Sequence, residues 1–89
     1  MRSIVTVIGK DSVGIIANVC AILAKYGVNI LDIKQTVLQG YFTMIMVVDT
    51  AGATISFIEL AELLEKDGAE RGLTIHIQRE DIFDAMHKV

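Results

Sequence analysis

Hydrophobic residues recur along the first third of this chain with two spacings, one typical of strands and the other of helices. Residues 4–8 are β-branched at every position, which predicts a strand buried on both of its faces. The apolar positions that follow recur at helical spacing and end at Gly27, where a helix terminus favours positive φ. We therefore expect a helix whose buried stripe consists of Ile15, Ile16, Val19, Cys20, Leu23 and Tyr26.

Two further strands are predicted on either side of Gln39 and Gly40, a dipeptide suited to a hairpin turn. The first of them, residues 28–37, changes its apolar parity near Leu31, which indicates a bulge or a bend there. Strict alternation places Val28 and Ile30 on one face of this strand. It places Leu31, Ile33 and Val37 on the other face.

The strand predicted at residues 41–48 is apolar on both of its faces. Phe42 and Met44 belong to one face, whereas Tyr41 and Ile45 belong to the other. Helices in a small two-layer domain cover only one face of the sheet. We therefore expect a second subunit to cover the other face.

The second half of the chain predicts a helix, a strand and a short final helix. The first helix begins at Thr54 or Ser56, since Ser56 and Glu59 have the spacing of a capping box, and it ends at Gly68 or Gly72. This helix has an apolar face that we expect to be buried. A half-buried strand follows it, and then a docked helix over residues 80–88. The apolar residues of these three elements are Phe57, Leu60, Ala61 and Leu64, then Leu73, Ile75 and Ile77, then Ile82, Phe83 and Met86.

This order of elements is typical of the ferredoxin-like fold, an α+β sandwich with the order βαββαβ. It predicts an antiparallel four-stranded sheet with two helices on one face, followed by the short C-terminal helix. We expect residues 1–89 to form one domain, with a core over about 1–79 and the final helix over about 80–88.

Composition narrows the class of protein. Of the 89 residues 53% are hydrophobic, and the formal net charge is -3. Such an apolar surplus on a small chain predicts a homodimer or a higher homo-oligomer. The acidic balance argues against nucleic acid, and no apolar run is long enough to cross a membrane. With the single Cys20, these features predict a cytoplasmic protein.

The most informative segment for chemistry runs from the first strand through a short polar turn into the first helix. The free N–H groups of a helix N-terminus there favour a carboxylate or another anion. Asp11 or Ser12 is the expected N-cap of this helix. The two histidines, His76 and His87, have no further ligand at metal-binding spacing, so neither a metal nor a cofactor is expected. We therefore interpret the chain as a module that senses a small molecule rather than an enzyme.

Three segments also carry a resemblance to a known family. They are the strand at 4–8 with Asp11-Ser12-Val13-Gly14-Ile15-Ile16, the segment Tyr26-Gly27-Val28-Asn29-Ile30, and the tail Ile77-Gln78-Arg79-Glu80-Asp81-Ile82-Phe83-Asp84-Ala85-Met86-His87. They resemble the ACT domain family over the whole chain, and in particular its stand-alone, single-domain members of bacteria and archaea. The chain departs from many relatives at Val13, where they carry a proline in the first helical turn.

The resemblance implies an amino acid bound between paired domains whose sheets join side by side. Carried over by position, Asp11, Ser12, Gly14, Ile15 and Ile16 would line one side of that site, and Asn29 and Ile30 of the partner the other. The chemistry suits an α-amino acid, because helix amides favour its carboxylate and an aspartate favours its ammonium.

The same residues also have purely structural interpretations. Asp11 and Ser12 can cap the helix, Gly14 can serve close packing, and Asn29 can satisfy a turn. A protein-interaction or assembly module without a ligand response, docking onto a partner protein, therefore remains an alternative. A small ferredoxin-like enzyme is a weaker one, since the loop after the first strand carries Lys10 but no phosphate-binding arginine.

Overall fold

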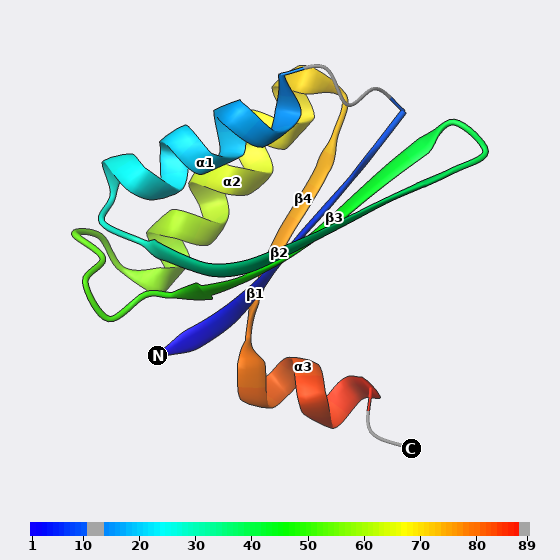
Figure 1. Ribbon diagram of the computed structural model, residues 1–89. Helices are drawn as coiled ribbons and strands as arrows, with labels where there is room; N and C mark the ends of the chain where they lie inside the picture. The colour runs from blue at the N-terminus through cyan, green and yellow to red at the C-terminus, as the bar shows by residue number, and fades with distance from the viewer. Residues whose placement is uncertain (11–13, 88–89) are drawn as a thin grey trace.

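The computed structural model describes residues 1–10 and 14–87, and Figure 1 shows the arrangement of its elements. The four strands form one antiparallel sheet in the order β2-β3-β1-β4. Helices α1 and α2 lie on one side of this sheet, and α3 lies on the other (Figure 1). The predicted ferredoxin-like fold with a short C-terminal helix is confirmed. The elements are β1 (Arg2–Gly9), α1 (Ile15–Lys25), β2 (Asn29–Leu38), β3 (Tyr41–Asp49), α2 (Phe57–Arg71), β4 (Thr74–Arg79) and α3 (Glu80–His87).

The core lies between the sheet and the first two helices. Alternate residues of the central strands β1 and β3 face it, so that Val5 lies opposite Met46 and Val7 lies opposite Met44. These four side chains are fully buried, and burial of each contributes about 1.5–3 kcal/mol. The helices cover them with a second set of buried side chains. That set consists of Ile15, Val19 and Leu23 from α1 and Leu60 and Leu64 from α2.

The other face of the sheet is covered at one end only. Helix α3 contacts β1 and β4, and an ion pair of 2.9 Å between Arg2 Nε and Glu80 Oε2 fastens its first turn to β1. Ile4 on this face is 6% exposed, whereas Ile8, four residues further along the strand, is 42% exposed. The apolar second face predicted from the sequence is therefore present, and α3 covers the part of it near Ile4.

The predicted irregularity of β2 is confirmed, since the register with β3 shifts between Ile30 and Asp32. One assignment drawn from strict alternation is wrong. Ile30, Ile33 and Val37 lie opposite Val48, Met46 and Phe42, which all face the helices. The extra residue at the bulge returns the later part of β2 to the same face, as bulges do. The predicted hairpin turn is also present, with φ of 48° at Gln39 and 82° at Gly40.

The ends of the helices test the capping predictions. Ser56 caps α2, because its hydroxyl accepts the Glu59 N–H at 3.2 Å, which is the N-cap half of a capping box. The Glu59 carboxylate reaches back to the Ser56 hydroxyl, which donates to Oε1 at 3.0 Å. Gly72 ends that helix with φ of 72°. The N-cap of α1 is Gly14, with φ of 73°, so the prediction of Asp11 or Ser12 at that position is wrong.

Gly27, at the end of α1, has the predicted positive φ, 75°. A Cβ added there would lie 2.5 Å from the carbonyl oxygen of Gly52. The position therefore requires glycine for two reasons, the backbone conformation and the close approach of a neighbouring loop.

The expected apolar face of the final helix is only partly buried. Phe83 is half-buried, but Ile82 is 46% exposed. Successive side chains point about 100° apart around a helix, and in this helix of 8 residues Phe83 is buried better than Ile82. None of the helices in the described part of the chain is long and apolar enough to span a membrane.

Candidate ligand site at the start of the first helix

The start of α1 presents backbone donors without side-chain caps. The Asn18 N–H donates to the Gly14 carbonyl at 3.1 Å and closes the first helical turn. The amides of the preceding turn, including those of Ile15 and Ile16, have no carbonyl partner within the helix. Over the described residues no side chain caps this end, and no acid lies in its first turn. Among the described residues, nothing therefore neutralises the positive end of the helix dipole.

Gly14 leaves space beside these amides. A Cβ built on it would meet no atom of the described residues within 4 Å, which leaves room for a ligand beside the backbone. Ile15 is 6% exposed and Ile16 is half-buried, which fixes the helix start on the core. These two residues can offer a ligand their amides more readily than their side chains. Asp11 and Ser12, the other members predicted for this side of the site, lie outside the described residues.

The second predicted half of the site lies at the opposite end of the helix layer. Asn29 is the exposed first residue of β2, and Ile30 beside it is half-buried against the core. Helix α1 separates them from Gly14 by its 11 residues, a length of about 16 Å. One copy of the chain therefore does not bring the two halves together.

Asp49 places a fixed negative charge beside Asn29, to which it pairs across the β2–β3 ladder. Its Oδ1 accepts the Ala51 N–H at 2.9 Å and an N–H of the terminal ammonium of Met1 at 3.1 Å. The Ala51 hydrogen bond foremost, and then the ammonium, lower the pKa of the Asp49 carboxyl below its ordinary value. One end of α1 thus combines exposed amides with positive potential, and the other combines an amide side chain with a carboxylate.

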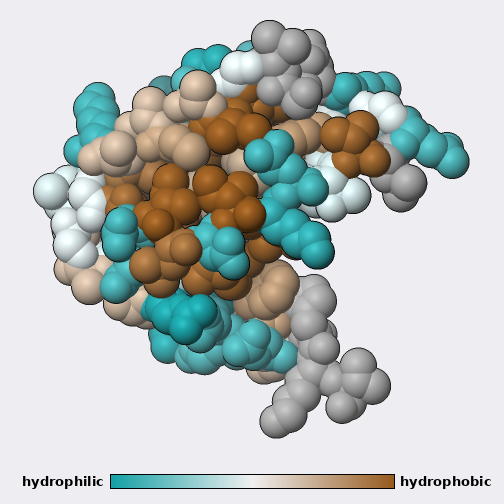
Figure 2. Space-filling view, viewed as in Figure 1, coloured by the Kyte–Doolittle hydropathy of each residue, from teal (hydrophilic) through white to brown (hydrophobic). Residues whose placement is uncertain are grey.

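The edge strand β2 connects these two ends and carries an exposed apolar surface. Leu31, Ile33 and Val37 are 48%, 36% and 67% exposed. Figure 2 shows hydrophobic side chains gathered over the β2 edge and the neighbouring flank of the helix layer, with polar groups around them. The outer N–H and C=O groups of this strand face no other strand of the sheet, and such an edge favours pairing with a further strand.

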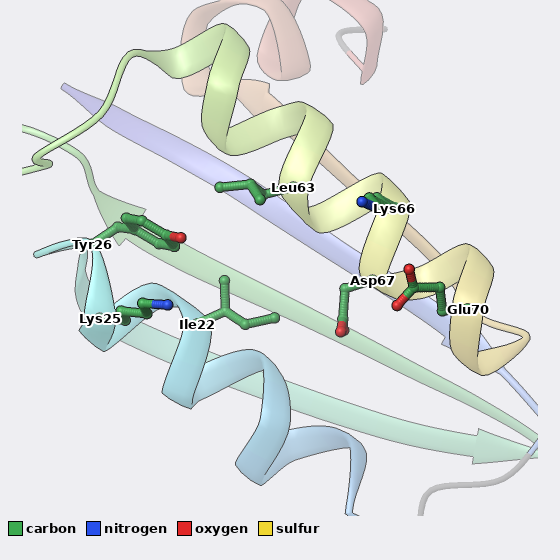
Figure 3. Close-up of a pocket in the computed structure, with 7 residues that line it drawn as sticks. All are labelled: Ile22, Lys25, Tyr26, Leu63, Lys66, Asp67 and Glu70. Carbon is green, nitrogen blue, oxygen red and sulfur yellow. The ribbon is translucent and has the colours of Figure 1, made fainter.

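A hollow that the sequence did not predict lies between α1 and α2 on the outer side of the helix layer (Figure 3). Its volume is about 260 Å³, and it carries charges of both signs over an apolar floor. Its residues are Ile22, Lys25, Tyr26, Leu63, Lys66, Asp67 and Glu70. The hollow is open to solvent, and it is separate from the predicted site.

Asp67 in this hollow is held by other side chains of the fold. It is half-buried, and its carboxylate accepts from Asn18 Nδ2 at 2.7 Å and from Arg71 Nε at 3.1 Å. The Asn18 hydrogen bond ties α1 to α2. Because 49 residues separate the two partners, no local pattern in the sequence indicates it. Asp67 is therefore occupied by the fold and is a poor candidate for ligand recognition.

Other side chains with reactive or metal-binding chemistry do not assemble into a site. No group of three or more potential metal ligands occurs among residues 1–10 and 14–87. His76 Nδ1 lies 3.9 Å from Glu65 Oε1, and both side chains are more than half exposed. Cys20 is half-buried against the core, as expected for a small apolar residue. The start of α1 and the β2 edge thus remain the best-supported candidate surface.

Comparison with known proteins agrees with this architecture. A family model described as an ACT domain matches residues 2–78. A UPF0237 protein of Listeria innocua is 51% identical over 89 residues, which is 100% of both chains. A UPF0237 protein of the archaeon Methanopyrus kandleri is 47% identical over 88 residues, covering 99% of this chain and 98% of the relative.

A solved structure of similar sequence gives the same result. It is an ACT domain protein from Streptococcus pneumoniae, with 43% identity and a TM-score of 0.83 over 94% of each chain. The family match, the full-length relatives and the common fold lead to one conclusion. The chain belongs to the ACT domain family.

Proposed function

We propose that this protein is a regulatory homodimer that binds an amino acid between its two copies. ACT domains in general are regulatory modules that bind amino acids or other small molecules. The observation that carries the finer proposal is the separation of the two half-sites. The uncapped amides at Gly14 and the polar side chain of Asn29 lie at opposite ends of α1, so a second copy is needed to join them.

Pairing of two β2 edges supplies the required geometry. Gly9, Phe42 and Val37 lie in one row across the sheet, at the end where α1 begins. An antiparallel two-fold pairing centred on Ile33 places residues of the same face opposite one another and brings the Asn29 end of the second copy's β2 alongside this row. Asn29 of that copy then lies at the same end as the first copy's helix start. The two-fold operation produces two such sites.

The apolar surface of β2 supports the same pairing. Leu31, Ile33 and Val37 remain exposed in the single chain, and edge pairing removes part of this surface from water. It also satisfies the outer backbone groups of the strand. An edge strand of 10 residues is long, since strands in globular proteins are typically about 5–6 residues in length.

An α-amino acid matches the polar groups that this arrangement assembles. Its carboxylate would accept from the amides of Ile15 and Ile16 at the positive end of the helix. Its ammonium would pair with the carboxylate of Asp11. The side-chain amide of Asn29, from the second copy, donates and accepts and would bridge to either group. Catalysis has no part in this proposal, and ligand occupancy would instead alter the relative placement of the two copies.

A thermal-shift panel of amino acids, with nucleotides and metal ions beside them, tests the proposal. A ligand at about 100 times its dissociation constant should stabilise the native state by about 2.7 kcal/mol. For a domain of this size that corresponds to a rise in Tm on the order of 10–20 °C. Asn29→Ala and Asp11→Ala should each abolish the shift. Glu62→Ala, on the exposed outer face of α2, is the matched control and should retain it.

A flat panel would contradict ligand binding and favour the second candidate, an interaction module that docks onto another protein. The hollow between α1 and α2 gives that candidate specific support, because Leu63 is 36% exposed on its floor. In that case Asn29→Ala would leave the assembly of the protein unchanged. Leu63→Glu would instead be the variant that loses a partner protein.

A further inference from the structure

The face of the sheet opposite α1 and α2 has an uncovered apolar half. Three large side chains on it, Ile8, Tyr41 and Ile45, are 42%, 52% and 40% exposed. They belong to the central strands β1 and β3 rather than to an edge. Each central strand is already hydrogen-bonded to a strand along both of its edges. A further strand that joined the edge of the sheet would therefore not cover these residues. Only an element that packs onto the face can do so.

Cations border this open half. Lys10 Nζ lies 6.0 Å from the centre of the Tyr41 ring. Lys34 lies opposite Ile45 in the β2–β3 ladder and therefore shares its face. The open half thus combines an apolar centre with positive charge at its margin. We refer to Ile8, Tyr41, Ile45, Lys10 and Lys34 as the open patch.

Helix α3 has the complementary character on its outer surface. Asp81, Asp84 and Ala85 are exposed, and Ile82 beside them is 46% exposed. The helix is amphipathic, yet part of its apolar surface faces away from its own sheet. It therefore presents an isoleucine among acidic residues, the counterpart of an apolar patch bordered by lysines.

We propose that the open patch of one copy binds α3 of a second copy, in a face-to-face pair related by a two-fold axis. Helix α3 projects from one end of the open face, where it covers Ile4, and the open patch lies towards the other end. A two-fold rotation that stacks two such faces antiparallel brings each α3 onto the other copy's patch. Both contacts are identical, as two-fold symmetry requires.

The proposed contact satisfies both surfaces at once. Ile82 would pack among Ile8, Tyr41 and Ile45, and the apolar surface so removed from water supplies the affinity. Asp81 and Asp84 would approach Lys10 and Lys34, which fixes the orientation of the helix. Asp81 already accepts from Arg79 Nη2 at 2.8 Å, so Asp84 is the better residue to probe by charge reversal.

This interface is distinct from the β2 edge and does not depend on the ligand proposal. Edge pairing extends the sheet sideways, whereas the α3 contact stacks two sheets. A chain that uses both surfaces assembles into four copies with two kinds of interface. Either interface can be removed by mutation while the other remains, so the two proposals fail independently.

Analytical ultracentrifugation over a concentration series, without ligand, provides the test. Leu31→Glu should block edge pairing and leave a dimer that is held by the α3 contact. Adding Ile45→Glu to that variant should convert the dimer to monomers. Lys34 is not used as a probe, because it also lies beside the centre of the proposed edge pairing. Circular dichroism on each variant verifies that the fold is retained.

A charge exchange identifies α3 as the bound element. Lys10→Glu and Asp84→Lys, each in the Leu31→Glu background, should raise the dissociation constant by about tenfold. The two reversals combined should restore it, because the ion pair is then re-formed with opposite polarity. Glu62→Lys, on the outer face of α2, is the control and should change nothing. The proposal would be overturned if the Leu31→Glu dimer persisted after Ile45→Glu was added. It would also be overturned if the two charge reversals each weakened the dimer but did not restore its dissociation constant when combined.

Discussion

The two faces of the sheet differ in how completely one chain covers them. Met44 and Met46 face α1 and α2 and are fully buried, whereas Ile45 between them faces the other way and is 40% exposed. The side chains are of comparable size and hydrophobicity, and the strand is the same. The difference shows that burial on the helix-facing side stabilises the monomer, while part of the other side remains exposed in the single chain.

Adjacent substitutions in β3 give the largest expected contrast between these faces. Met46→Ala should lower the free energy of unfolding by about 2–5 kcal/mol, because it leaves a cavity in a closely packed core. Ile45→Ala should cost the monomer less than about 1 kcal/mol, since the side chain is already partly in water. Urea unfolding at low protein concentration measures both values without a contribution from association. Equal losses would contradict the assignment of the faces.

Two glycines sharpen the comparison between the ends of α1. Gly27→Ala should destabilise the protein by about 2–4 kcal/mol, because it combines positive φ with a clash against the Gly52 carbonyl. Gly14→Ala should cost about 1 kcal/mol, since it has the same sign of φ but no described residue within 4 Å of the added Cβ. Thermal unfolding of the two variants side by side measures the difference. A larger loss at Gly14 would show that the helix start is more closely packed than its geometry indicates.

Much of this fold could be predicted because local chemistry specifies it. Three features each depend on residues a few positions apart: the bulge near Leu31, the Ser56 cap at the start of α2, and the positive φ of Gly27. The N-cap of α1 was mispredicted for a related reason. Asp11 and Ser12 are favourable cap residues, but Gly14 occupies the N-cap position in a left-handed conformation that side-chain preference alone does not indicate.

Features that depend on distant parts of the chain were missed. The Asn18–Asp67 hydrogen bond joins two helices, and the cover that α3 gives to Ile4 joins the two ends of the chain. Neither leaves a periodic signal in the sequence. The candidate site has another basis. Gly14 and Asn29 were carried over from the family resemblance, which already assigned them to different copies, and the helix predicted between them already implied their separation.

Ser3 lies on the well-covered face and offers a smaller effect of opposite sign. Its side chain is fully buried opposite Val48, and its hydroxyl has no hydrogen-bond partner among the described residues. A buried hydroxyl without a partner is costly, so Ser3→Ala should stabilise the protein by about 1 kcal/mol and raise its Tm by about 4–8 °C. Ser3→Thr, which retains the hydroxyl, is the control and should bring no such gain. A loss of stability in Ser3→Ala would show that the hydroxyl has a partner in solution.

Asp49 gives the smallest expected effect, at the exposed margin near Asn29. The pKa of its carboxyl is lowered in the folded state, chiefly by the Ala51 N–H and then by the terminal ammonium. The folded protein therefore favours the charged form of this carboxyl more than the unfolded chain does. The resulting stability is present above the ordinary pKa of an aspartate and is lost as the pH falls through the lower, folded value. Asp49→Asn should flatten this part of the acid-unfolding curve and leave the curve near neutral pH almost parallel to that of the wild type. If its acid limb remained as steep as before, another carboxyl would be responsible for the loss, and the charge beside Asn29 would not be fixed by these two hydrogen bonds.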